Sequence, residues 1–182
     1  MARRLDTEIG DLALIEPEIH GDERGFMVET FRADAWRELG VEADFVQENH
    51  SRSGAGTLRG LHFQTEPGQA KLVRCARGQI WDVVVDLRSD SPTYRRWEGH
   101  ELDDETHRQL YVPVGFAHGF CVLSELADVA YKLSSCYDPA TESGIAWDDP
   151  EIAVEWPVSD PVLSDRDREA PQLMEVEDEL PW

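Results

Sequence analysis

Tyr111-Val-Pro-Val-Gly-Phe-Ala-His-Gly-Phe120 is the stretch that decides the fold, because it places a turn between two short apolar runs. Pro113 and Gly115 favour the turn, and the flanking runs, 109–112 and 117–123, have the length of strands. Outward from this stretch, alternating apolar segments recur at intervals of roughly 8 to 12 residues, separated by Gly, Pro, Asp and Ser. This rhythm is typical of a sandwich or barrel.

The pattern predicts an all-β chain with little helix. One short helix is predicted at 33–39, where Gly40 would provide a left-handed C-terminal cap. From Asp160 onward, prolines and acidic residues predict a loop-rich C-terminal extension, with one helical turn near 164–169. Short strands in this number suit a jelly roll, and a chain of 182 residues suits a single domain over 1–182. The predicted strands are 12–18, 26–31, 45–50, 58–64, 71–76, 79–87, 97–102, 109–112, 117–123 and 129–133.

The charge of the chain is strongly negative. Its 38 acidic and 17 basic residues give a formal net charge of -21, which would repel a nucleic-acid backbone or an anionic membrane. We therefore expect no nucleic-acid or membrane partner. A high-salt cytoplasm is one hypothesis for this surface, since salt screens the self-repulsion, and an ordinary acidic enzyme is the alternative. Unfolding midpoints that fail to rise with added salt would contradict the first.

The cysteines and the N-terminal stretch indicate a reducing interior. The three cysteines, Cys75, Cys121 and Cys136, are odd in number and lack the CxxC spacing of a zinc knuckle. Residues 1–10 carry no apolar run of the kind found in an export signal, and no stretch of 18 apolar residues occurs. We expect a cytoplasmic location.

A histidine lies in the middle of the predicted strand 58–64. Taken alone, His62 is more often a structural residue than a catalytic one. Strict alternation places His62 and Arg59 on opposite faces of the strand, so a pocket that used both would need a bulge, for which Gly60 is the candidate.

Three other residue types in predicted strands could carry chemistry. Lys71 begins a strand in a chain whose cations are otherwise almost all arginine, and its ammonium suits an oxyanion that develops on a ketone; a solvated strand end is the alternative. Asp82 and Asp86 share one face of a strand and need partners if they are buried. A tyrosine such as Tyr131 in an apolar strand most often anchors a hydrogen bond.

The spacing from Pro113 through Gly115 to His118 resembles the second motif of the cupin fold, in which the histidine is a ligand in metal-binding members. The first cupin motif should supply a His-x-His pair. The matching strand contains only His62, followed by phenylalanine and Gln64, so we expect no metal site. Near the C-terminus, the run 163–168 holds carboxylates that could orient a histidine, although such charge runs are solvated in most proteins.

Seven segments carry a resemblance that is far more specific together than any one of them alone. They are 21–26, 45–52, 58–62, 71–74, 115–119, 147–150 and 164–167. Together they resemble the dTDP-4-dehydrorhamnose 3,5-epimerase family over nearly the full length of the chain. In that family the fold is a metal-free jelly-roll homodimer, and the substrate is the nucleotide sugar dTDP-4-dehydro-6-deoxyglucose. The resemblance implies the same fold, a homodimer and no cofactor here.

The resemblance also implies roles for individual residues. His62 would be the base, Asp167 its hydrogen-bonded orienter, Lys71 the enolate stabiliser, and Tyr131 the acid on the opposite face of the sugar ring. Phe26 and Tyr137 would stack on the thymine. The remaining implied substrate contacts are Arg24, Glu29, Gln47, Asn49, Arg59, His118, Glu142 and Arg166.

Two departures from the family pattern leave alternatives open. The segment from His62 to Lys71 is one residue shorter than in many members, beside the sugar pocket, and Arg166 replaces a lysine before the late aspartate. A single-centre epimerase or isomerase of another 4-keto sugar is therefore one alternative. The others are a non-catalytic cupin that binds a sugar nucleotide and a metal-dependent cupin enzyme. Tyr137 also competes with Tyr131 for the role of the acid.

Overall fold

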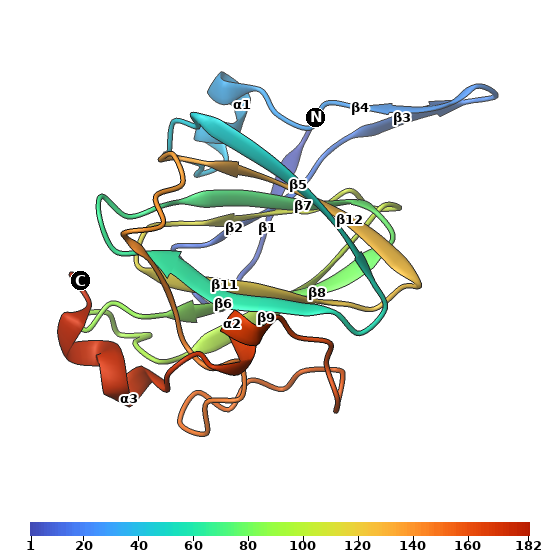
Figure 1. The fold of residues 1–182 in the computed structure, drawn as a ribbon. Helices are drawn as coiled ribbons and strands as arrows, with labels where there is room; N and C mark the ends of the chain where they lie inside the picture. Colours follow the sequence, from blue (N-terminus) through green and yellow to red (C-terminus); the bar gives the residue numbers. More distant parts are fainter.

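Two antiparallel sheets packed face to face form the body of the protein, as the computed structural model of residues 1–182 shows (Figure 1). The six-stranded sheet has the order β1-β2-β10-β7-β12-β5, formed by Arg3–Leu5, Ala13–Glu16, Gln109–Val112, Lys71–Arg77, Leu126–Leu133 and Gln47–Gly54. The five-stranded sheet has the order β13-β6-β11-β8-β9, formed by Glu142–Gly144, Leu58–Gln64, Phe116–Val122, Gln79–Asp86 and Trp97–Asp103.

A separate hairpin and a few short helices complete the chain. Strands β3 (Ile19–Asp22) and β4 (Gly25–Val28) pair only with each other and project away from the two sheets (Figure 1). None of the helices is long and apolar enough to span a membrane. The helices are α1 (Ala33–Glu38), α2 (Asp165–Arg168), α3 (Leu173–Val176) and the 3-10 turn η1 (Glu177–Glu179).

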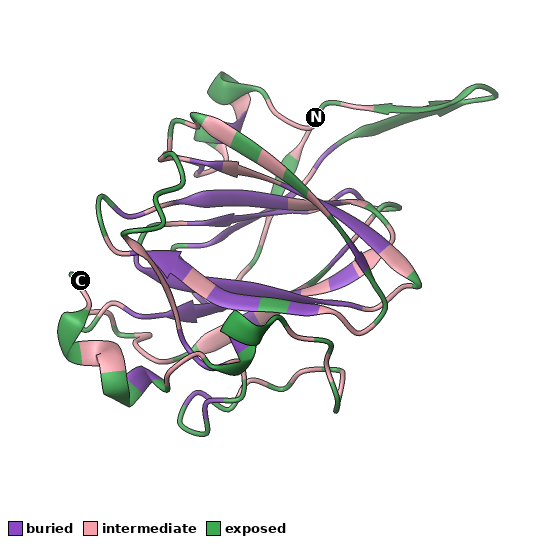
Figure 2. Ribbon diagram, viewed as in Figure 1, coloured by how far each residue is buried: buried purple, intermediate pink, exposed green.

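The main core fills the space between the two sheets, where the central strands are almost entirely buried (Figure 2). Alternation along each strand sends every second side chain inward, as for Ile80 and Val84 on β8, which meet Val73 on β7. At one end of this interior the inward positions become polar. That end holds the candidate site.

Both outer faces are also covered. Leu173 of α3 and Ile152 pack with the outward side chains Val83 and Val85 of β8, so the C-terminal extension seals the five-stranded sheet. On the other side, Trp36 of α1 is buried in a cluster that covers the six-stranded sheet. Because the extension is held by this packing, it can position residues against the sheet it covers.

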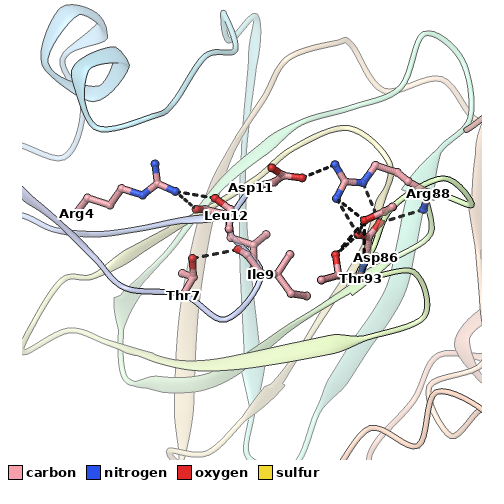
Figure 3. A network of polar contacts seen from close by, with 10 residues as sticks. Arg4, Thr7, Ile9, Asp11, Leu12, Asp86, Arg88 and Thr93 are labelled. Carbon is pink, nitrogen blue, oxygen red and sulfur yellow. Dashed lines mark hydrogen bonds and ion pairs between the residues drawn. The ribbon is translucent and has the colours of Figure 1, made fainter.

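The buried carboxylate of Asp86 finds its hydrogen-bond partners in a polar network at the end of β8 (Figure 3). Its carboxylate accepts hydrogen bonds from Arg88 Nε at 2.8 Å and from the hydroxyls of Ser91 and Thr93 at 2.6 Å each. Burial raises the pKa of Asp86, but these donors outweigh it and lower the pKa overall. Arg88 also donates to Asp11 at 2.6 Å, which ties the loop after β8 to the N-terminal segment.

The structure confirms the predicted all-β class. The predicted helix at 33–39 appears as 33–38, and Gly40 has the left-handed φ of +99° expected of its cap. Strands β1, β3 and β13 were outside the prediction because each is only three or four residues long and mainly polar or glycine-containing. Their pairing is a tertiary effect that the alternation of apolar residues does not reveal.

Candidate active site

A cavity of about 310 Å³ lies at the polar end of the sandwich. It is lined by strands of both sheets and by α2. Four of the residues that line it are the catalytic candidates His62, Lys71, Tyr131 and Asp167. It also contains six of the predicted substrate contacts: Asn49, Arg59, His118, Tyr137, Glu142 and Arg166.

The predicted bulge in β6 is confirmed. His62 is the register partner of His118 and Arg59 that of Phe120, so two residues of β6, Gly60 and Leu61, oppose one residue of β11. Gly60 has a φ of +118°, and a Cβ there would lie 2.5 Å from the Cα of Gly119. The bulge lets both Arg59 and His62 line the cavity, which strict alternation would forbid.

His62 forms a pair with Asp167 of the C-terminal extension. The distance from Nε2 to Asp167 Oδ1 is 2.5 Å, and Ser164, the N-cap of α2, accepts a hydrogen bond from the backbone N–H of Asp167. Burial raises the pKa of Asp167, but the hydrogen bonds from His62 and Ser164 and the nearby positive charges together outweigh it, and the net pKa lies below the ordinary value. An ionised Asp167 holds the imidazole proton at Nε2, so Nδ1 keeps its lone pair.

Lys71 is buried at the start of β7 with its Nζ 3.1 Å from the carbonyl oxygen of His62. Burial lowers its pKa to about 8, while the nearby carboxylates of Asp82 and Glu142 act in the opposite direction. The ammonium therefore lies beside His62 inside the cavity and not at a solvated strand end.

A second histidine–aspartate pair lies opposite the first, across the pairing of β6 with β11. His118 Nε2 is 2.9 Å from Oδ2 of Asp82, which is fully buried and whose Oδ1 has no hydrogen-bond partner. Burial lowers the pKa of His118, and Lys71 adds to the effect, although Asp82 opposes it. Asp82 is thus a partner for His118, whereas Asp86 serves the distant network described above.

The remaining polar side chains line the walls and the mouth. Asn49 Nδ2 donates to the Tyr131 hydroxyl at 3.4 Å, and Arg166 of α2 forms an ion pair with Glu142 of β13 at 2.6 Å. Tyr137 is half exposed, and the nearby carboxylate of Glu142 raises its pKa. The Glu142–Arg166 pair links the extension to the sheet beside His62.

Four predicted contacts do not line this cavity. Gln47 lies next to it, where its side chain accepts from the Tyr137 N–H at 2.9 Å and donates to Asn49 at 3.0 Å. The other three belong to the projecting hairpin or directly follow it: Arg24, Phe26 and Glu29. Within one chain, the structure does not bring these three to His62.

Sequence reasoning missed five residues that line the cavity. Ser51 follows Gln47 and Asn49 at the strand period of two, so alternation could have found it. Gln69 lies two residues before Lys71 and had no motif to mark it. The other three are Phe120, Leu133 and Ser164. No three His, Cys, Asp or Glu side chains converge as a metal site would require.

The chain is similar to known proteins over nearly its full length. Residues 6–175 match the family model described as dTDP-4-dehydrorhamnose 3,5-epimerase. The dTDP-4-dehydrorhamnose 3,5-epimerase of Shigella flexneri is 51% identical over 165 residues, which cover 90% of this chain and 91% of that protein. A dTDP-4-dehydrorhamnose 3-epimerase of Streptomyces niveus is 46% identical over 166 residues, with coverage of 90% and 80%.

A solved structure shares the whole fold. The dTDP-6-deoxy-D-glucose-3,5-epimerase of Legionella pneumophila, in complex with dTDP-4-keto-L-rhamnose, superposes with a TM-score of 0.95 at 46% sequence identity. The match covers 98% of this chain and 96% of that chain. On sequence and on structure, the chain belongs to the dTDP-4-dehydrorhamnose 3,5-epimerase family.

Proposed function

We propose that this chain epimerises C3 and C5 of dTDP-4-dehydro-6-deoxyglucose to give dTDP-4-dehydro-L-rhamnose. The observation that carries the proposal is the convergence of the His62–Asp167 pair, Lys71 and Tyr131 on one cavity. The family relatives are named for this reaction, and the Legionella pneumophila structure holds a dTDP-linked keto sugar.

The chemistry begins at His62. Both C3 and C5 lie next to the C4 ketone, so the C–H bond at each is acidic enough for a positioned base. The Nδ1 lone pair of His62 takes the proton, and the electron pair of the broken C–H bond moves into an enolate. Asp167 then lies against an imidazolium, whose positive charge it stabilises.

Lys71 stabilises the enolate and Tyr131 completes the inversion. With its pKa lowered to about 8, Lys71 is mostly an ammonium at pH 7 and can pair with the enolate oxygen in a largely desolvated place. Tyr131 donates its hydroxyl proton to the carbon from the opposite face as the enolate returns to the ketone, and is left as a tyrosinate. Solvent reprotonates the tyrosinate and takes the proton from the His62 imidazolium, so both groups are restored. No step of this scheme calls for a cofactor.

The nucleotide would lie toward the mouth of the cavity. Arg59 and Arg166 are proposed to pair with the pyrophosphate, since guanidinium groups bind phosphate oxygens through two donors. Asn49, Gln47, His118 and Glu142 remain proposed substrate contacts, and the half-exposed ring of Tyr137 is proposed to stack on the thymine.

The projecting hairpin favours a homodimer. Phe26 and Met27 are 60% and 70% exposed on β4, a large apolar surface for a two-stranded hairpin. Since Arg24, Phe26 and Glu29 lie outside their own chain's cavity, we propose that the hairpin carries them to the cavity of a second copy. Mixing an inactive His62→Ala variant with an inactive Arg24→Ala variant should then restore part of the activity, because some mixed dimers contain one intact site. No recovery in a mixture of verified dimers would contradict this arrangement.

Single-centre epimerisation is the second candidate function. It is favoured by the shortened segment between His62 and Lys71 and by the similarity to a 3-epimerase. The three cysteines are unpaired, which agrees with a reducing, cytoplasmic location for either enzyme.

The test is NMR of dTDP-4-dehydro-6-deoxyglucose incubated with the protein in deuterated water, with a reductase present to trap the product. Deuterium at both C3 and C5 with an L-rhamnose product supports the proposal. Label at one centre supports the single-centre enzyme, and no label contradicts both.

The same assay separates the two tyrosines. Tyr131→Phe should still exchange deuterium but invert poorly, whereas Tyr137→Phe is the matched control that keeps inversion if Tyr131 is the acid. The opposite result would transfer the role to Tyr137.

A further inference from the structure

Gln69 lies on the wall of the catalytic cavity and has no role in the scheme above. It belongs to the connection between β6 and β7. It precedes Lys71 by two residues, so it lies beside the group that holds the ketone oxygen in the proposed reaction.

The orientation of the Gln69 amide is set by a chain of hydrogen bonds. Gln64 Nε2 donates to the backbone carbonyl of Asp138 at 2.9 Å; a carbonyl can only accept, so Gln64 must direct its Oε1 the other way. Gln69 Nε2 donates to that Oε1 at 2.8 Å and to the carbonyl oxygen of Ser135 at 3.1 Å. A flipped Gln69 amide would bring two oxygens together at both contacts.

This arrangement leaves one acceptor free. Gln69 Oε1 accepts no hydrogen bond within the chain, and it is not among the buried unpartnered atoms, so it keeps some accessible surface on a residue that lines the cavity. A carbonyl oxygen held by a fixed amide is a preorganised acceptor for a ligand hydroxyl.

We propose that Gln69 Oε1 accepts a hydrogen bond from the hexose hydroxyl on C3, and that this contact makes Gln69 a specificity-determining residue. The inference rests on the proposed function. The ketone and the pyrophosphate carry no proton to donate, so the hydroxyls are the donors that the keto-hexose offers. C3 is bonded directly to the ketone carbon. The ketone oxygen pairs with Lys71 in the proposed reaction, and Lys71 is only two residues from Gln69 along the chain.

The experiment compares Gln69→Met with Gln79→Met as a matched control. Gln79 lies on β8 outside the cavity, where its amide meets Glu101. Titration calorimetry uses two probes: dTDP, which has no hexose, and dTDP-glucose, which has the C3 hydroxyl but no ketone and does not react. Removing one neutral hydrogen bond should weaken dTDP-glucose binding by about fivefold to tenfold and leave dTDP binding unchanged.

A second readout is the ratio of deuterium at C3 to deuterium at C5, which Gln69→Met should lower because C3 loses its positioning contact. Gln69→Ala removes the acceptor without filling the site. It should likewise weaken dTDP-glucose binding while leaving dTDP binding unchanged. Equal weakening of dTDP and dTDP-glucose, or no change in either affinity, would overturn the inference. If wild-type protein introduces no deuterium at all, the proposed function fails. The hydroxyl contact is still tested separately, because Gln69→Met should weaken the binding of dTDP-glucose and not that of dTDP.

Discussion

Two histidine–carboxylate pairs face each other across the β6–β11 ladder, and only one of them is suited to act as a base. His62 and His118 are register partners, and each binds an aspartate through Nε2. The side chain of His62 is 28% exposed and that of His118 only 7%. A base must become a cation when it takes a proton, and burial disfavours a cation.

The origin of each carboxylate reinforces the difference. Asp82 lies on β8, the strand next to His118, and is fully buried close to Lys71. Asp167 arrives on α2 from the C-terminal extension, about one hundred residues along the chain from His62. The same two residue types thus form a partly exposed pair, in which the proposed base has room to become a cation, and a more deeply buried pair, in which burial favours a neutral imidazole.

Removal of His62 should have the largest effect. His62→Ala should lower deuterium exchange at C3 and C5 by on the order of 10³-fold, because a positioned general base contributes about 10² to 10⁴ in rate. Substrate binding, measured with dTDP-glucose, should stay largely intact. His118→Ala is the matched variant, and its exchange should fall by only on the order of tenfold. Equal losses in the two variants would remove the distinction between the pairs.

Asp167→Asn should have the next largest effect. An amide can donate to Nε2 and so favour the tautomer with its proton at Nδ1, which cannot accept a proton from the sugar. We expect kcat to fall on the order of 10²-fold with little change in KM. A variant with wild-type kcat would show that Asp167 does not orient the base.

The fall of kcat/KM at alkaline pH should distinguish the carboxylate of Asp82 from that of Asp167. Lys71 has its pKa lowered to about 8 and is charged below that value, so kcat/KM should fall as the pH rises through about 8. Asp82 favours the ammonium of Lys71, so Asp82→Asn should move this limb to lower pH. Asp167→Asn should leave its position unchanged. A limb that stays in place in Asp82→Asn would exclude Lys71 as its origin.

Ser164→Ala should have the smallest effect. The Ser164 hydroxyl caps α2 by accepting from the Asp167 N–H at 3.1 Å, and loss of such a cap costs about 1 kcal/mol. Since the helix is short, we expect a loosened Asp167, a fall in kcat of about fivefold or less, and nearly unchanged thermal unfolding. A large fall in the unfolding temperature would instead mean that Ser164 supports the whole extension.

Much of the fold could be predicted because short-range patterns carry it. The period of two located the central strands, and Pro113, Gly115 and Gly40 marked a turn and a helix end. The conflict between Arg59 and His62 pointed to the bulge at Gly60, since one face of a strand cannot hold both. The short strands β1, β3 and β13 escaped prediction because their pairing depends on distant partners.

The candidate site could be predicted only in part from the sequence. Motifs marked the residues that carry reactive groups, including His62 and Lys71, but Ser51 and Gln69 needed the assembled cavity. Asp82 and Asp86 were equivalent in the sequence, on one face of one strand. The structure separates them, because one meets His118 and the other meets Arg88.

The sequence by itself determined the period-two pattern of the central strands and the candidate position of the bulge, because these depend on backbone sterics and on residues a few positions apart. The roles expected of the reactive side chains came from the resemblance to the family. Only the tertiary structure decided which carboxylate serves which histidine, how deeply each pair is buried and which way the Gln69 amide points. Those properties depend on segments far apart in the chain that packing brings together, and on the water that packing excludes.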